Sequence, residues 1–186
     1  MKPYEHKVQY YETDKMSIVH HSNYIRWMEE ARVDFLEQIG WGMDRLEALG
    51  MVSPVIAVDC KYKVSTRFPE RIRIEVGIEE FRGVKLKLKY AMYKEDGTLA
   101  CEGHSEHGFL DANGKIISVK KEFPECYAAL MEYAVGVEKQ DPKTKGDNLM
   151  NREDFTWRDG IKSIIILIWR KWFRSVVPVY ADTTVR

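Results

Sequence analysis

Residues 11–40 read YETDKMSIVHHSNYIRWMEEARVDFLEQIG. In the second half of this stretch, apolar side chains recur every three or four residues, the pattern of a helix with one apolar face. These side chains are Tyr24, Trp27, Met28, Ala31, Phe35 and Ile39. Ser22 or Asn23 can cap the start of the helix, and Gly40 is suited to end it. The spacing therefore predicts one long helix that is buried along one side.

After this helix the apolar pattern changes from helical spacing to alternation, which is typical of half-buried strands. The sequence predicts strands over 6–11, 55–64, 71–81, 84–93, 98–110 and 116–119, and shorter helices over 43–49 and 123–133. A turn sequence such as Glu95-Asp96-Gly97 favours antiparallel pairing of the strands that it joins. The order of elements predicts an α+β fold in which a central helix lies against an antiparallel sheet.

The overall composition excludes several classes of protein. The chain has 186 residues, 29 Lys and Arg, and 29 Asp and Glu, so its formal net charge is zero. This length fits one domain with room for an appendage, and the balanced charge argues against a nucleic-acid binder. The N-terminus has no apolar segment of the secretory type. Three widely spaced cysteines are typical of reduced thiols in the cytoplasm, which is the expected location.

Asp14 is the first candidate for chemistry, because it closes a predicted strand about eight residues before the long helix begins. Backbone N–H groups without partners and the positive end of the helix dipole gather at a helix start. Such donors suit an oxyanion that forms on a carbonyl under attack. A carboxylate beside them can act as a nucleophile or as a general base for water. The alternative is that Asp14 only caps the loop.

The same stretch resembles a known family. Residues 11–14 (YETD) and 18–24 (IVHHSNY), continued by 26–32 (RWMEEAR), resemble the signature of hotdog-fold acyl-CoA thioesterases. The similarity is greatest to the branch related to 4-hydroxybenzoyl-CoA thioesterases, which includes the Tol-Pal-associated thioesterases. It extends through the strand order to about residue 133. The resemblance implies a long central helix wrapped by a five- to six-stranded antiparallel sheet. The C-terminal extension of the chain lies beyond the residues that the resemblance covers.

The resemblance also implies an activity, which is hydrolysis of an acyl-CoA thioester to a free acid and CoA, without a cofactor. The partners that it implies are the acyl-CoA substrate and further copies of the chain in a homodimer or homotetramer, with the thioester bound at the protomer interface. Asp14 becomes the catalytic carboxylate, either attacking the thioester or activating water. The N–H group near His21 would polarise the thioester oxygen, and the His21 side chain would position water or substrate. The residues expected to shape the substrate site are Ser17, Val19, Asn23 and Tyr24.

Ser17 departs from the family pattern, which commonly has glycine three residues after the aspartate. Glycine tolerates a positive φ and a close approach of backbone or ligand. A serine there puts the level of activity in doubt. It keeps open an alternative, in which the chain is a non-catalytic module that binds acyl-CoA or an acyl carrier protein.

Basic residues offer candidate contacts for the phosphates of CoA. Lys85, Lys87 and Lys89 share one face of a predicted strand, and Arg67 and Arg82 lie in loops beside strands. A lysine ammonium is a compact charge that suits a phosphate. The alternative interpretation is a solvated face of the sheet.

Histidines are candidate metal ligands, but their spacing predicts no metal site. His20 and His21 have no carboxylate or cysteine partner at a spacing typical of zinc. His104 and His107 lie three residues apart on one predicted strand, so they are expected on opposite faces. One of them could point toward the active cleft, with surface or packing roles as the alternative.

The remaining length needs a separate account. Residues 1–137 form the predicted thioesterase domain, and 138–186 form a linker and a C-terminal extension of unknown role. Residues 161–177 can form a helix with isoleucines and Trp172 on one face and basic residues opposite. The sequence leaves three alternatives for it: a helix at a membrane surface, a helix packed on the domain or on a protein partner, and a peripheral segment.

Overall fold

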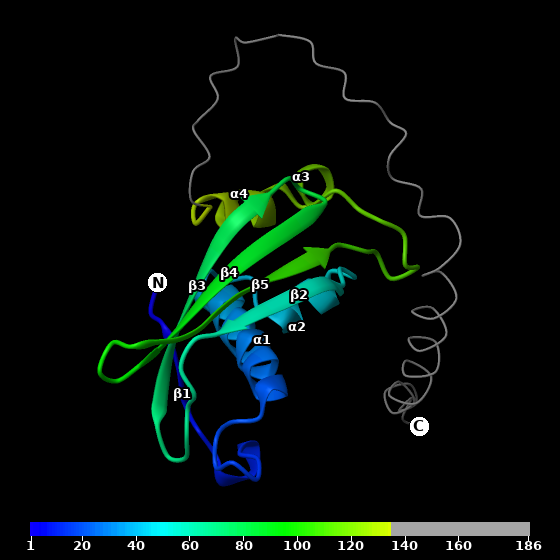
Figure 1. Ribbon diagram of the computed structural model, residues 1–186. Helices are drawn as coiled ribbons and strands as arrows, with labels where there is room; N and C mark the ends of the chain where they lie inside the picture. The colour runs from blue at the N-terminus through cyan, green and yellow to red at the C-terminus, as the bar shows by residue number, and fades with distance from the viewer. Residues whose placement is uncertain (135–186) are drawn as a thin grey trace, which may run out of the picture. The chain divides into compact units, whose positions relative to one another are not determined.

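The computed structural model describes residues 1–134, shown in colour in Figure 1. The predicted domain boundary at 137 and the predicted membrane or protein contact over 161–177 lie outside these residues. Among residues 1–134, no helix combines the length and the apolar character needed to cross a bilayer.

Five strands form one antiparallel sheet, as predicted. They are β1 (Tyr4–Lys7), β2 (Val55–Tyr62), β3 (Arg71–Phe81), β4 (Lys85–Lys94) and β5 (Leu99–Gly108). Their order across the sheet is β1-β3-β4-β5-β2, and every neighbouring pair is antiparallel. Strands β3, β4 and β5 follow one another through tight turns, while β1 and β2 form the two edges.

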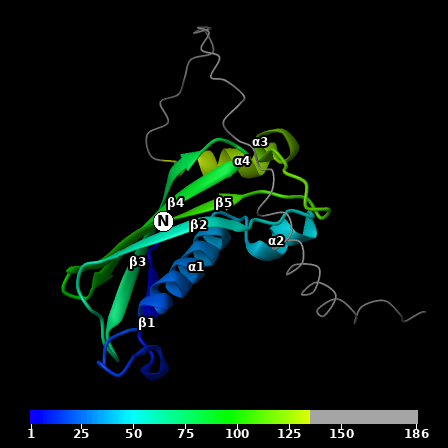
Figure 2. The same cartoon turned by 45° about the vertical axis from the view of Figure 1, so that its right-hand side comes forward.

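The long helix α1 (His21–Gln38) lies across one face of this sheet, and both Figure 1 and Figure 2 show this arrangement. Its predicted apolar face is the buried one, because Tyr24, Trp27, Met28, Ala31 and Phe35 are all at most 3% exposed. The sheet presents alternate side chains of β3 and β4 to the helix, among them Ile72, Ile74, Leu88 and Met92. The central helix and the α+β class are therefore confirmed.

Three short helices complete the described chain. Helix α2 (Met43–Ala48) follows α1, and α3 (Val119–Glu122) and α4 (Pro124–Met131) follow the sheet. Figure 1 shows α3 and α4 at the end of the sheet opposite to the segment that leads into α1. A hydrogen bond of 2.9 Å from Val19 N to Thr66 O ties that segment to the loop between β2 and β3.

Two predicted strands were wrong in extent. Strand β1 ends at Lys7, and Tyr10–Glu12 form the short 3-10 helix η1. The cause is a contact that the strand pattern does not encode: the Glu12 carboxylate accepts a hydrogen bond from Gln9 N at 2.6 Å and curls the chain. The predicted strand 116–119 contributes only an isolated bridge from Ile116 to Leu110 before α3 begins.

The edge strand β2 differs from the inner strands because both of its faces are exposed. Four of its larger apolar side chains are at least 40% exposed: Val55, Ile56, Val58 and Tyr62. One of its edges pairs with β5, and no described strand pairs with the other. An apolar edge of this kind is a ready template for pairing with another chain.

Candidate functional site

The segment before α1 forms a small hairpin that places Asp14 beside the start of the helix. Thr13 and Val19 form an antiparallel bridge, and Asp14 N donates to Ile18 O at 2.8 Å. Ser17 N donates to Asp14 O at 2.9 Å and closes the turn. The second arm of the hairpin leads directly into α1, so Asp14 and the helix start are held side by side.

Ser17 occupies the position in this turn that requires a left-handed backbone. Its φ is +59°, and it is the only non-glycine residue with positive φ within residues 1–134. A hairpin that closes with a tight turn followed by a left-handed residue is a common form, and glycine is favoured at that place. Ser17 therefore adopts the backbone conformation for which the glycine of the family pattern is suited.

Asp14 is half-buried, and one of its carboxylate oxygens takes part in the turn. Oδ1 accepts a hydrogen bond from Met16 N at 2.7 Å. This is the loop-capping contact of the simpler interpretation, and it also fixes the orientation of the carboxylate. The turn thus holds a carboxylate in one position beside a helix N-terminus.

The helix start supplies hydrogen-bond donors. The N-cap is His20, not Ser22 or Asn23 as predicted, and its ring Nδ1 lies 2.8 Å from Ser22 Oγ. His21 is the first residue of α1, so its N–H belongs to the turn whose N–H groups have no intrahelical acceptors. The rings of His20 and His21 are exposed and stack with centroids 4.1 Å apart. Both can reach a molecule bound at the corner that the hairpin and the first turn of α1 form beside Asp14.

Asn23, Tyr24 and Val19 lie at the same corner, but their contacts brace the loop. Asn23 is buried, and its Nδ2 donates to the Glu12 carbonyl at 2.8 Å. The Tyr24 hydroxyl lies 2.8 Å from Oγ1 of Thr66, which is fully buried. Burial raises the pKa of Tyr24, against the opposing effect of its hydrogen bond to Thr66. These side chains therefore face the protein interior.

Arg67 and Tyr62 reach the corner from the strand side. Arg67 Nη1 donates to Ser17 O at 3.1 Å, so one predicted CoA ligand touches the hairpin itself. The Tyr62 hydroxyl donates to His21 O at 3.1 Å. Sequence reasoning did not single out Thr66 or Tyr62, because nothing in the order of residues shows that the β2–β3 loop lies against the hairpin.

Arg82, Lys85 and Lys87 lie away from Asp14. Lys85 and Lys87 alternate with the buried Leu86 and Leu88, so they occupy the face of the sheet opposite to α1. Lys85 pairs with Glu106, and Lys87 pairs with Glu79 at 2.9 Å. Arg82 follows β3, whose 11 residues span roughly 35 Å at about 3.3 Å each. Within one protomer these residues belong to a solvated face, which was the alternative interpretation.

His104 and His107 occupy opposite faces of β5, as predicted. His104 is partly exposed, with Nδ1 3.2 Å from Asp59 Oδ1. His107 is buried under α1, and its Nε2 lies 2.7 Å from Ser105 Oγ. Burial, with a smaller contribution from Arg32, lowers the pKa of His107 to about 4. It is therefore a neutral packing residue at neutral pH.

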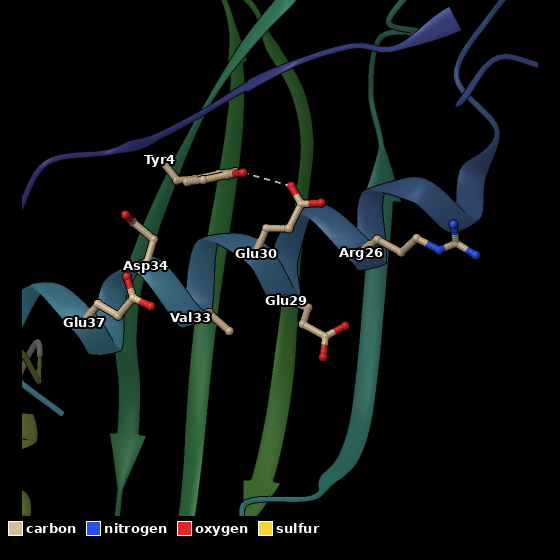
Figure 3. A pocket seen from close by; sticks show the side chains of 7 residues that line it. All are labelled: Tyr4, Arg26, Glu29, Glu30, Val33, Asp34 and Glu37. Atoms are coloured by element: carbon tan, nitrogen blue, oxygen red, sulfur yellow. Dashed lines mark hydrogen bonds between the residues drawn. The ribbon is translucent and has the colours of Figure 1, made fainter. Parts of the chain in front are cut away.

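Neither the groove along α1 nor a cluster of metal-ligating side chains suggests a second candidate site within the described residues. A groove of about 660 Å³ follows the outer side of α1 (Figure 3). Its lining consists of Tyr4, Arg26, Glu29, Glu30, Val33, Asp34 and Glu37. Four carboxylates make it unsuited to the phosphates of CoA, and Asp14 does not line it. No group of three or more potential ligand side chains within residues 1–134 is arranged to hold a metal ion.

Comparison with known proteins gives consistent matches over the described residues. The model of the thioesterase-like superfamily matches residues 8–132. The chain is 33% identical over 126 residues to the protein named "Putative acyl-CoA thioesterase YneP" from Bacillus subtilis, covering 67% of this chain and 91% of that one.

Solved structures of thioesterases and related proteins are also similar to this chain. The DHNA-CoA thioesterase from Staphylococcus aureus is 30% identical with a TM-score of 0.68, and the match covers 70% of this chain and 89% of that one. The hypothetical protein TT1821 from Thermus thermophilus is 32% identical with a TM-score of 0.64. That match covers 99% of the Thermus chain and 72% of this one. The rest of this chain therefore has no counterpart in that relative.

Proposed function

The chain belongs to the thioesterase-like superfamily, and from this premise we propose that it hydrolyses an acyl-CoA thioester through the carboxylate of Asp14. Water and the thioester give a carboxylic acid and CoA. Asp14 either attacks the thioester carbon and forms an anhydride that water then opens, or it takes a proton from the attacking water. In both routes the C–S bond breaks and the CoA thiolate leaves and takes up a proton.

The observation that carries this proposal is the hairpin that joins Asp14 to the first turn of α1. The bond from Asp14 N to Ile18 O and the bond from His20 N to Glu12 O are both 2.8 Å. They hold the carboxylate and the helix N-terminus in one geometry. The His21 N–H and the positive end of the helix dipole then stabilise negative charge on the thioester oxygen.

The named relatives support acyl-CoA as the substrate class. The Bacillus protein is named as an acyl-CoA thioesterase and the Staphylococcus protein as a thioesterase of DHNA-CoA. Arg67 lies beside the hairpin and is exposed, so it is placed to contact a phosphate of CoA. Val19 and Ser17 form the hairpin wall, and Asn23 and Tyr24 hold it in place.

A second copy of the chain completes the site in this proposal. Strand β2 offers an edge that no strand within residues 1–134 pairs with, and its apolar side chains are exposed. Tyr62, near the end of β2, touches His21. Pairing of two such edges would bring a partner next to each hairpin. Lys85 and Lys87, which lie away from Asp14 of their own protomer, would contact CoA only from another copy.

A panel of aliphatic and aromatic acyl-CoAs, assayed by release of the CoA thiol, tests the proposal. We expect turnover of at least one member, with the Asp14→Asn variant inactive on it. Tight binding of panel members without turnover would replace the proposal with the non-catalytic binding module.

A further inference from the structure

Glu12, two residues before Asp14, is a buried carboxylate that receives hydrogen bonds from three segments of the chain. It is 5% exposed. Its Oε1 accepts from Trp27 Nε1 of α1 at 2.8 Å, and its Oε2 accepts from Gln9 N at 2.6 Å. Oε2 also lies 3.0 Å from Nε2 of His6, on β1. A buried charge is tolerated only with partners of this kind, and three of them fix the position of this side chain.

The charge of Glu12 persists despite its burial. Burial alone would raise the pKa of this carboxyl, but the hydrogen bonds from Gln9, His6 and Trp27 outweigh it and lower the pKa below 4.5. Glu12 is therefore a carboxylate at any pH suited to an assay.

The backbone of the same residue holds both the hairpin and the helix start. The Glu12 carbonyl accepts from His20 N at 2.8 Å and from Asn23 Nδ2 at 2.8 Å. The bridge of the hairpin begins at the next residue, Thr13. Any displacement of Glu12 therefore moves Asp14 relative to the first turn of α1.

The network continues from Glu12 to the outer side of α1. Nδ1 of His6 lies 3.1 Å from Glu30 Oε2, and the Tyr4 hydroxyl donates to the same oxygen at 3.0 Å, a contact drawn in Figure 3. The His6 ring also stacks on Trp27, with centroids 4.5 Å apart. His6 therefore lies between the carboxylates of Glu12 and Glu30. Glu30 is the outer member of this network and does not touch the hairpin.

We propose that Glu12 is a positioning residue for the reaction: its buried, three-fold hydrogen-bonded carboxylate locks the hairpin so that Asp14 faces the helix N-terminus. This proposal rests on the proposed function. The arrangement suits such a role, because an error of about 1 Å in the position of a reacting group can cost about 100-fold in rate.

The test compares Glu12→Gln with the matched control Glu30→Gln. Both changes remove one carboxylate beside His6 and keep the side-chain shape. In Glu12→Gln the new amide directs an NH₂ group at donors, so at least one of the three hydrogen bonds is lost. We expect kcat for Glu12→Gln to fall 10- to 100-fold with KM within threefold, while Glu30→Gln keeps kcat within twofold. Unchanged kcat in folded Glu12→Gln, or an equal loss in Glu30→Gln, overturns the proposal.

Two further measurements keep the test decisive. Amide hydrogen exchange needs no substrate, and we expect it to quicken at least tenfold over residues 13–20 in Glu12→Gln only. Hydrogen exchange still tests the role of Glu12 in holding the hairpin if the wild type hydrolyses no acyl-CoA. That second result would contradict the proposed function and not the role of Glu12. If Glu12→Gln does not fold, Trp27→Phe keeps an aromatic ring and removes the donor to Glu12. A three- to tenfold loss of kcat in that variant supports the proposal, and an unchanged kcat overturns it.

Discussion

Ser17 shows at the scale of one residue how the chain keeps its loop while departing from the family pattern. The turn demands a left-handed residue, and Ser17 adopts φ +59° there. A non-glycine residue in this conformation costs roughly 1–2 kcal/mol. Two hydrogen bonds hold Ser17 in this strained conformation, one from Ser17 N to Asp14 O and one from Asp14 N to Ile18 O.

Replacing Ser17 by glycine should therefore stabilise the protein. The relief of strain is partly offset by the greater freedom of glycine in the unfolded chain, about 0.5–1 kcal/mol. We expect a net gain of about 0.5–1 kcal/mol, or roughly 2–4 °C in Tm, with kcat within twofold. Ser17→Ala is the control, since it keeps a Cβ and should bring no gain. A lower Tm for the glycine variant in thermal unfolding would contradict this account of the turn.

His107 gives a second prediction at the residue scale. Burial and Arg32 lower its pKa in the folded protein to about 4, against 6.5 ordinarily. Below pH 6.5 His107 binds a proton in the unfolded chain, whereas in the folded chain it binds one only below about pH 4. Stability should therefore fall with falling pH through this window, by about 3 kcal/mol. Urea unfolding at pH 7 and pH 4 should show this loss in the wild type and a smaller one in His107→Gln. An equal loss of stability in the wild type and in His107→Gln would contradict this account of His107.

At the scale of elements, the site depends on how closely α1, β5 and β2 approach one another. A Cβ on Gly103 of β5 would lie 2.3 Å from the carbonyl oxygen of Asp59 on β2 and 2.4 Å from Met28 Cε on α1. The first of these atoms is backbone, so the strands themselves would have to part. Gly103 thus allows α1, β5 and β2 to pack closely against one another.

Gly103→Ala should destabilise the protein by at least about 2 kcal/mol, the scale of overpacking in a tight core. Gly77→Ala on β3 is the matched control, because its Cβ would meet only the flexible side chain of Lys89, at 3.0 Å. Chemical denaturation measures both. Similar free energies of unfolding for the two variants would show that the close approach at Gly103 is unimportant.

The elements also show what the sequence could predict. Strand β3 was predicted over its full range, since Ile or Val recurs at every second position from Ile72 to Ile78. The start of α1 was displaced because an N-cap histidine is unusual, and the cap preference pointed to Ser22. The inward roles of Asn23 and Tyr24 depend on Glu12 and Thr66, and Thr66 lies 42 residues from Tyr24 in the chain. Local patterns carry no information on such long-range contacts.

At the scale of the whole molecule, the distribution of exposed groups matters more than the zero net charge. The outer side of α1 is acidic, and Lys85 and Lys87 of β4 are paired with glutamates on the opposite face of the sheet. The exposed apolar strand β2 is the surface that we propose for contact with another copy of the chain.

Val58→Asp should therefore weaken self-association. Val58 is 40% exposed on β2, and a carboxylate there would meet its own copy across a paired edge. Light scattering should show a shift toward monomer, accompanied by a loss of activity. Val84→Asp, at a residue 43% exposed outside β2, is the control that should keep the wild-type mass. An unchanged mass for Val58→Asp would contradict pairing through this edge.

The central claim is that Asp14 is the catalytic carboxylate, and the chain contains a close structural match for a control. Asp96 Oδ1 accepts from Thr98 N at 2.9 Å, as Asp14 Oδ1 accepts from Met16 N at 2.7 Å, so both aspartates cap a turn through the residue two positions on. Only Asp14 stands beside a helix start. The decisive measurement is the rate of CoA thiol release by Asp14→Asn and Asp96→Asn on the best acyl-CoA substrate. We predict at least a 100-fold loss for Asp14→Asn and a rate within twofold of wild type for Asp96→Asn. Near-wild-type release by folded Asp14→Asn would contradict the claim.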